Sequence, residues 1–124
     1  MKVEVSDGEL FDKMVILRIK KERIGNPERV ANVVKELELL EATCAQISPA
    51  PPAELIAELK TVNEALWVIE DDIRQKESRQ EFDDEFIRLA RSVYVTNDKR
   101  AEAKRKINLF TESELIEEKS YEDY

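Results

Sequence analysis

Histidine is absent from these 124 residues, and Cys44 is the only cysteine. Without histidine the chain has no Ser-His-Asp triad, no histidine metal site and no imidazole to shuttle protons near neutral pH. A lone cysteine cannot form a disulfide within the chain, which favours a cytoplasmic protein. We interpret Cys44 as a packing residue near a helix end and not as a nucleophile.

Long apolar runs and an excess of positive charge are also missing. No segment approaches the roughly 18 apolar residues of a membrane span, and no signal peptide is present, so the sequence predicts no membrane association. The formal net charge of −8 repels nucleic acid and acidic lipids, which argues against a nucleic-acid partner. Charged residues make up 39% of the chain and only two glycines interrupt it. This balance is typical of long solvated helices.

Apolar positions recur in steps of three and four along two segments joined by a short polar break near residues 76–80. The first segment carries Leu55, Leu59, Val62, Leu66, Ile69 and Ile73. The second continues the same steps with Phe82, Phe86, Leu89, Val93, Thr96, Arg100, Ala103 and Ile107, of which Thr96 and Arg100 are polar. Such steps put side chains on one helical face, as in a coiled coil. Because the break is short, we expect the two helices to be antiparallel neighbours, with Leu66 against Val93.

Local signals place another helical hairpin before this one. Residues 6–9 have the spacing of a capping box, and the helix that follows is predicted to end at residues 24–25, with glycine in a left-handed turn. Asn26 and Pro27 suit the start of the next helix. Three prolines within residues 49–52 then end that helix and open the third.

The end of the chain contains a further capping-box pattern at residues 111–114, which predicts a short last helix. The acidic residues after it either fray or fold back against the basic cluster at residues 104–106. The sequence therefore predicts a single all-α domain over residues 1–124. Its architecture is an antiparallel helical bundle of two helical hairpins, with about four main helices and a short C-terminal helix.

A second, mostly polar stripe lies one position beyond each apolar seam. It contains Ile56, Asn63, Trp67 and Glu70 on one long helix and Tyr94, Asn97 and Lys104 on the other. The register places Asn63 near Asn97 and Glu70 near Arg91. Polar groups at a helix interface must be solvated, paired across the helices or covered by other helices. Asn63 and Asn97 either contact a ligand or only fix the register, and Trp67 fits a core residue better than a stacking platform. The candidate ligand-binding residues are Asn63, Trp67, Tyr94, Asn97, Lys99 and Lys104.

Four carboxylates fall within residues 64–72 of the predicted third helix. One interpretation is a solvated acidic face that contacts nearby basic side chains. The alternative is a divalent cation site, because Mg²⁺ prefers carboxylate oxygens and retains several waters. The candidate metal ligands are Glu64, Glu70 and Asp71.

Basic side chains occupy five of the eight positions from residue 99 to residue 106. Ammonium and guanidinium groups suit a small molecule that contains phosphate. In an acidic protein the same run equally suits ion pairs within the chain or with a second copy. The run is short and lacks interleaved aromatic residues, which again argues against nucleic acid.

Four groups of residues, spread over nearly the whole chain, form a specific combined pattern. They are residues 8–10 with 12–13 and 16–17, residues 62–63 with 66–67 and 69–71, residues 90–94 with 97–98 and 100, and residues 117–121. The pattern resembles a small uncharacterised family of bacterial and phage-associated helical proteins of unknown function. The resemblance implies membership and brings no assigned activity, cofactor or site.

A weaker resemblance involves residues 96–99 and the basic residues after them. This segment is similar to a helix end in the all-α nucleoside triphosphate pyrophosphohydrolases, which implies a helical bundle that binds Mg²⁺ and cleaves between the α and β phosphates. Glu38 and Glu41 match the first half of that family's metal motif, Glu-x-x-Glu. The nearest second half, residues 81–84, lies in the predicted turn.

Two hypotheses follow. The first is a non-catalytic helical module that forms a homo-oligomer or binds a partner and needs no cofactor, because no complete catalytic constellation is present. The second is a Mg²⁺-dependent hydrolase of nucleotides or phosphate esters, in which a metal-activated water attacks and histidine is not needed. We favour the first, and whether the chain catalyses any reaction is left open.

Overall fold

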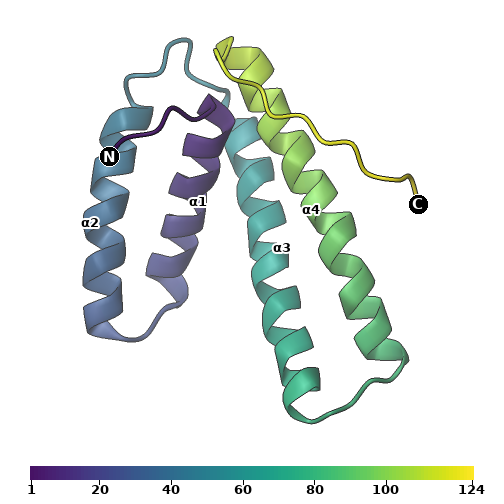
Figure 1. Cartoon of the computed structure of the whole chain (residues 1–124). Helices are drawn as coiled ribbons and strands as arrows, with labels where there is room; N and C mark the ends of the chain where they lie inside the picture. The colour runs from purple at the N-terminus through teal and green to yellow at the C-terminus, as the bar shows by residue number, and fades with distance from the viewer.

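The computed structural model describes the whole chain, which folds into four α-helices and no strand (Figure 1). The helices are α1 (Asp7–Arg23), α2 (Pro27–Cys44), α3 (Ala53–Ser78) and α4 (Asp84–Thr111). Helices α1 and α2 form one hairpin and α3 and α4 the other, which confirms the predicted all-α class. None of the helices is both long and apolar enough to cross a membrane.

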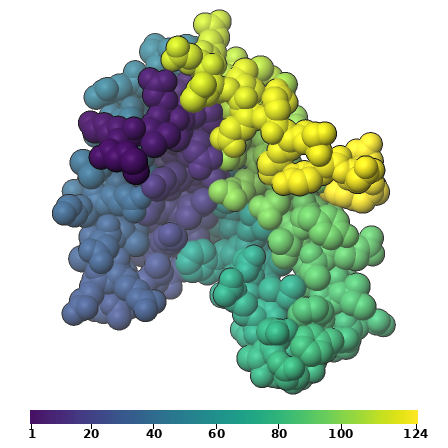
Figure 2. All heavy atoms as spheres, viewed as in Figure 1, coloured from purple at the N-terminus to yellow at the C-terminus, as the bar shows by residue number.

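Helix α1 joins the two hairpins. It packs against α2 on one side and against both α3 and α4 on the other, whereas α2 packs against α1 alone. The hairpins lie close together at the end that holds the linker between α2 and α3, and they diverge toward their turns (Figure 1). The longer α3–α4 hairpin projects past the end of α1, and a hollow separates the two lobes (Figure 2).

Eleven apolar residues form the core around α1. They are Phe11, Met14, Val15, Leu17, Ile19, Val33, Leu37, Cys44, Leu59, Ala103 and Ile107. No residue between Asn63 on α3 and Ala103 on α4 is buried. The part of the hairpin beyond Trp67, residues 68–93, is called the distal hairpin below. It lacks the third helix that would bury its apolar side chains.

Three of the helices have a side chain that caps their first turn by accepting hydrogen bonds from backbone amides. The Ser6 hydroxyl accepts a hydrogen bond from a first-turn amide of α1 (3.2 Å), and Asn26 caps α2 ahead of Pro27 in the same way, both as predicted. The other half of the capping box is not formed, because the Glu9 carboxylate pairs with Lys104. Asp83 caps α4 (3.0 Å) and also accepts a hydrogen bond from Lys76 across the turn (2.8 Å). Each cap satisfies amide groups that have no partner within the helix.

The left-handed glycine predicted after α1 is wrong. The helix ends at Arg23, and the next residue, Ile24, is extended with φ −81° and ψ 125°. Neither glycine of the chain has a positive φ, whereas Gln80 and Glu112 do. The chain leaves α1 through extended backbone, so no left-handed residue is needed there.

The predicted short C-terminal helix is also wrong. Helix α4 continues to Thr111, and residues 112–124 form a tail without a helix. Thr111 and Ser113 form hydrogen bonds to the first residue of α1 instead. The Thr111 hydroxyl donates to the Asp7 carboxylate (2.7 Å), and the Ser113 hydroxyl accepts from the Asp7 amide (3.0 Å). Because α1 uses these side chains, they do not cap a further helix.

The start of α1 is packed closely against the end of α4. The Gly8 amide donates to Asn108 Oδ1 (2.6 Å), and the Lys104 ammonium pairs with the Glu9 carboxylate. A Cβ atom at Gly8 would lie only 2.5 Å from the backbone oxygen of Lys104. The close approach of two backbones therefore requires glycine at this position.

We expect Glu112→Gly to raise the free energy of unfolding by up to about 1 kcal/mol, because relief of a left-handed strain of about 1–2 kcal/mol outweighs the conformational entropy that glycine adds to the unfolded chain. Glu112 follows α4 with φ 56° and ψ 46°, a left-handed conformation that glycine adopts without strain. The substitution also removes a negative charge from the negative end of the helix dipole. Glu112→Ala removes the same charge and keeps the Cβ atom, so the extra gain of the glycine variant isolates the backbone effect. Urea unfolding followed by circular dichroism measures both, and equal stability of the two variants would contradict the prediction.

Candidate functional site

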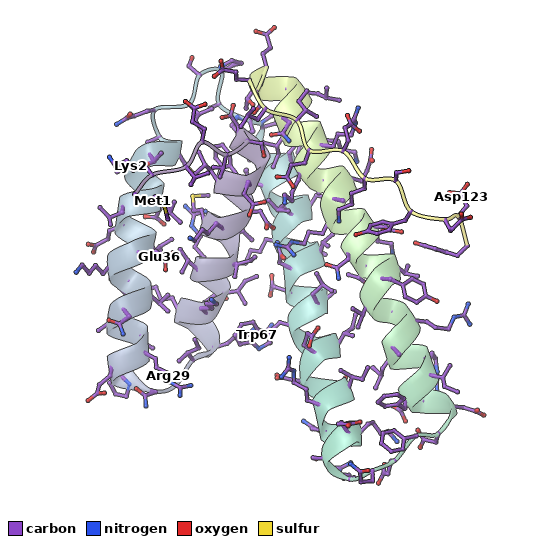
Figure 3. The ribbon with its side chains drawn as sticks, viewed as in Figure 1. Met1, Lys2, Arg29, Glu36, Trp67 and Asp123 are labelled. Carbon is purple, nitrogen blue, oxygen red and sulfur yellow. The ribbon has the colours of Figure 1, made fainter.

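A groove of about 460 Å³ lies where α1, α3 and α4 meet. Its apolar walls come from Ile16 of α1 and from Leu66 and Trp67 of α3. Trp67 points from α3 toward α1, across the space between the two hairpins (Figure 3). The polar lining consists of Asn63, Glu70, Asp71, Arg74, Asn97 and Arg100. The groove thus combines an apolar wall with amide groups and charges of both signs, and its polar lining residues outnumber its apolar ones.

A buried carboxylate lies beneath this groove. Both carboxylate oxygens of Asp12 accept hydrogen bonds from the Arg100 guanidinium, and Asn63 Nδ2 donates to Asp12 Oδ1 (2.8 Å). The Asp12 side chain is only 1% exposed. The hydrogen bonds to Asp12 raise the pKa of Arg100 above its usual value. This network joins α1, α3 and α4 through one charged contact.

The placement of Asp12 and Arg100 follows from helical spacing. Asp12 lies between Gly8 and Val15 on the face of α1 that packs against α3 and α4. Arg100 occupies a position of the α4 seam whose neighbours at the next turns are apolar or small. Reasoning from the sequence missed this pair. The signal was the arginine within an apolar seam, because a charge at such a position needs a partner of opposite sign.

Three of the six predicted ligand-binding residues line the groove: Asn63, Trp67 and Asn97. Asn63 and Asn97 therefore share one site, as the predicted register requires. Trp67 also packs against the core, and its part in binding a ligand stays a prediction. Glu70 and Arg91, which the register places near each other, form no ion pair, and the Arg91 guanidinium donates to the Tyr94 hydroxyl (3.3 Å). Glu70 pairs instead with Arg74, one turn along its own helix, at 3.2 Å.

The other three predicted ligand-binding residues lie outside the groove. Tyr94 packs its ring against that of Tyr124 in the tail, with centroids 5.3 Å apart. Lys99 is exposed on α4 and forms no ion pair. The Lys104 side chain extends from α4 to the start of α1, where it contacts Glu9, and it also contacts Glu117 of the tail. A phosphate group in the groove would therefore not reach Lys104 without breaking those contacts.

The three predicted metal ligands do not converge. Glu64 pairs with Arg23 of α1 (3.5 Å), Glu70 pairs with Arg74, and Asp71 is exposed. No group of three or more acidic or cysteine side chains in the structure is arranged to hold a metal ion. A Mg²⁺ site needs oxygen ligands that point at one position. The geometry therefore does not favour the Mg²⁺-dependent hydrolase, which stays an untested alternative.

The basic run at residues 99–106 forms ion pairs within the chain. Four of its five basic side chains are paired: Arg100 with Asp12, Lys104 with Glu9 and Glu117, Arg105 with Glu118, and Lys106 with Glu58. Two of these partners belong to the C-terminal tail, which folds back onto α4. Of the two interpretations of the run, pairing within the acidic chain is the one that these contacts support.

We expect Cys44 to react with thiol reagents only after unfolding. Desolvation by burial is the largest influence on this thiol and raises the pKa of Cys44 to about 11. Only the thiolate reacts. At pH 8, alkylation of the folded chain should therefore be on the order of 100-fold slower than alkylation of the chain unfolded in urea. The rate for the folded chain should rise only as the pH approaches 11. Iodoacetamide labelling followed by mass spectrometry measures both rates. Similar rates in the two states would show that Cys44 is accessible.

Residues 1–124 match a family described as "Family of unknown function (DUF6165)". No curated protein and no solved structure matches the chain. The family match confirms the predicted membership of a family of unknown function and does not extend to the weaker pyrophosphohydrolase resemblance. On this match over its full length, the chain belongs to the DUF6165 family.

Proposed function

We propose that this protein is a non-catalytic interaction module whose distal hairpin binds the distal hairpin of a second copy. The single observation that carries the proposal is the absence of any buried residue between Asn63 and Ala103. Helices gain most of their stability by burying an apolar face against other helices. Two helices alone leave each other's outer faces open, whereas two such hairpins form a four-helix bundle.

The surface for this contact is an apolar patch near the turn of the hairpin. The distal patch comprises Phe82, which lies in the turn just before α4, and Phe86, Ile87 and Ala90 in the first two turns of that helix. Phe82 is 55% exposed and Ile87 is 54% exposed, although Phe82 packs its ring edge against Phe86. Large apolar side chains that cluster in the open are typical of a protein interface.

Charges on the two helices of the distal hairpin support a second copy as the occupant. Asp71 and Asp72 of α3 form no ion pair, and neither do Arg88 and Arg91 of α4. In a symmetric dimer each surface meets its own copy, so α3 of one chain can face α4 of the other. Such an arrangement would pair the free aspartates with the free arginines around the apolar patch.

Sedimentation equilibrium over a range of chain concentrations tests the proposal. We expect the wild-type chain to pass from monomer to dimer as its concentration rises. Ile87→Glu should weaken the dimer by at least about tenfold in the dissociation constant, because each dimer would bury two unpaired carboxylates. Leu39→Glu is the matched control, since Leu39 is 67% exposed on α2, away from the distal hairpin.

Two results would contradict self-association through this patch. One is a wild-type chain that stays monomeric throughout the concentration series. The other is a dimer that Leu39→Glu weakens as much as Ile87→Glu, which would place the interface elsewhere. Circular dichroism of both variants checks that the helices remain intact.

A further inference from the structure

The C-terminal tail runs back along the outer side of α4 and ends over the middle of that helix (Figures 1 and 2). Three contacts in sequence hold it there. The Glu118 carboxylate pairs with Arg105 (2.5 Å), the Tyr124 hydroxyl donates to Asp98 (2.6 Å), and the Tyr124 ring lies edge-on to Tyr94. The tail is thus bound to α4 in the manner of a linear peptide, with no helix or strand of its own.

We propose that the α4 surface beneath the tail is a docking site for an acidic, tyrosine-bearing extended segment of a partner protein. The tail occupies this site as an internal competitor. The docking face is defined by Tyr94, Asp98, Ala101 and Arg105, which follow one another at steps of three and four on one side of the helix. It lies apart from the distal patch, and Asn97 is the one residue that lines both a hollow beneath the tail and the groove between the hairpins.

The chemistry of the docking face matches the segment that now lies on it. Arg105 supplies a guanidinium for a carboxylate, and the hydrogen bond that it donates to Glu118 raises the pKa of that guanidinium. Asp98 accepts a hydrogen bond from the hydroxyl of Tyr124, and Tyr94 offers an aromatic ring against which the ring of the same tyrosine packs. A carboxylate followed at a distance by a tyrosine is therefore the pattern that the face recognises.

The tail covers the docking face without filling it. Two hollows of about 550 and 540 Å³ lie between the tail and α4, the first next to Ala101 and Arg105 and the second next to Tyr94 and Asp98. Tyr121, which lies between the two ends of the contact, is 77% exposed. A partner segment with larger side chains at these positions would bury more surface than the tail does.

The contacts that hold the tail are weak enough to be exchanged. Glu118 and Tyr124 are both largely exposed, and ion pairs between exposed side chains contribute little to stability. Lys104 differs, because its side chain is only 15% exposed and its ammonium also pairs with Glu9 of α1, a contact that does not involve the tail. Releasing the tail beyond Glu117 therefore frees Arg105, Asp98 and Tyr94 and leaves the start of α1 in place.

Fluorescence anisotropy with a labelled peptide that copies residues 113–124 tests the site on the full chain. The double variant Glu118→Lys with Tyr124→Ala should release the tail and leave the docking face intact. We expect this variant to bind the wild-type peptide at least tenfold more tightly than the wild-type chain does, because the internal competitor is gone. Adding Arg105→Glu to the variant should abolish the gain, and higher salt should weaken binding.

Peptide binding that is no tighter after tail release overturns the proposal. So does binding that Arg105→Glu leaves unchanged. All the substituted side chains are at the surface, so circular dichroism is expected to be the same for every variant. Repeating the titration with Ile87→Glu, which leaves the docking face unaltered, separates this site from self-association through the distal patch.

Discussion

Replacing Arg100 with methionine is expected to lower the free energy of unfolding by about 3–5 kcal/mol. Arg100 holds both carboxylate oxygens of Asp12, whose side chain is 1% exposed. Methionine keeps most of the side-chain volume and removes the charge. The Asp12 carboxylate would then be left in the interior with only the amide of Asn63 as a partner. A buried charge without its counter-charge is among the most destabilising changes that one substitution makes.

A double variant separates the charge from the packing. Asp12→Asn with Arg100→Met removes both charges, and the new side chain still accepts a hydrogen bond from Asn63. We expect the double variant to recover at least half of the stability that Arg100→Met loses, since an ion pair removed as a unit leaves no isolated charge. A double variant as unstable as the single one would show that packing, and not charge, sets the loss.

An exposed pair of the same chemistry is the control for this experiment. Arg18 pairs with Glu41 at 3.1 Å, and both side chains are 43% exposed. Arg18→Met should change the free energy of unfolding by no more than about 1 kcal/mol. Urea unfolding at one fixed chain concentration measures all the variants, because any self-association would make stability concentration-dependent. Equal losses for Arg18→Met and Arg100→Met would contradict the buried ion pair.

Gly8→Ala is expected to lower the free energy of unfolding by about 1–3 kcal/mol. Alanine in a helix is normally about 1 kcal/mol better than glycine, so helix propensity alone predicts the opposite sign. The added Cβ atom would lie 2.5 Å from the backbone oxygen of Lys104 and 2.9 Å from Asn108 Oδ1. A backbone oxygen cannot rotate away, so α1 must shift from α4 and weaken the hydrogen bond from the Gly8 amide.

Gly25→Ala provides the matched control, because Gly25 is the only other glycine of the chain. A Cβ atom there would meet nothing within 4 Å, and the backbone φ is not positive. We therefore expect a gain of about 0.4–1 kcal/mol from the smaller conformational entropy of the unfolded chain. Thermal and urea unfolding should give opposite signs for the two substitutions. If Gly8→Ala were stabilising, the backbones of α1 and α4 could not approach each other as closely as the contact between Gly8 and Lys104 requires.

Most of the fold could be predicted because its signals are local. The apolar steps of three and four from Leu55 to Ile107 depend only on which side of a helix each residue occupies. The polar break at residues 76–80 is too short for anything other than an antiparallel return. The caps at Ser6 and Asn26 are likewise contacts between neighbours in sequence. Each of these features was recognisable without knowledge of the other hairpin.

The groove could be predicted only in part. Asn63 and Asn97 belong to the two helices of one hairpin, so their register follows from the length of the turn, and both line the groove. Asp12 belongs to the other hairpin. Nothing local says that α1 crosses α3 and α4 at the level of Asn63, so the ion pair with Arg100 was missed. The same limit applies to Lys104, whose partner Glu9 lies on α1.

The C-terminal region shows most clearly how tertiary contacts can override a local sequence pattern. Residues 111–114 have the pattern of a helix start, and in isolation that pattern favours a helix. In the folded chain Thr111 and Ser113 bond to Asp7, and the acidic residues that follow pair with the basic side of α4. Neighbouring residues were sufficient to specify four helices and their pairing, since those depend on spacing along the chain. Which polar groups meet between the hairpins depended on how two rigid units pack, because those contacts join residues far apart in sequence.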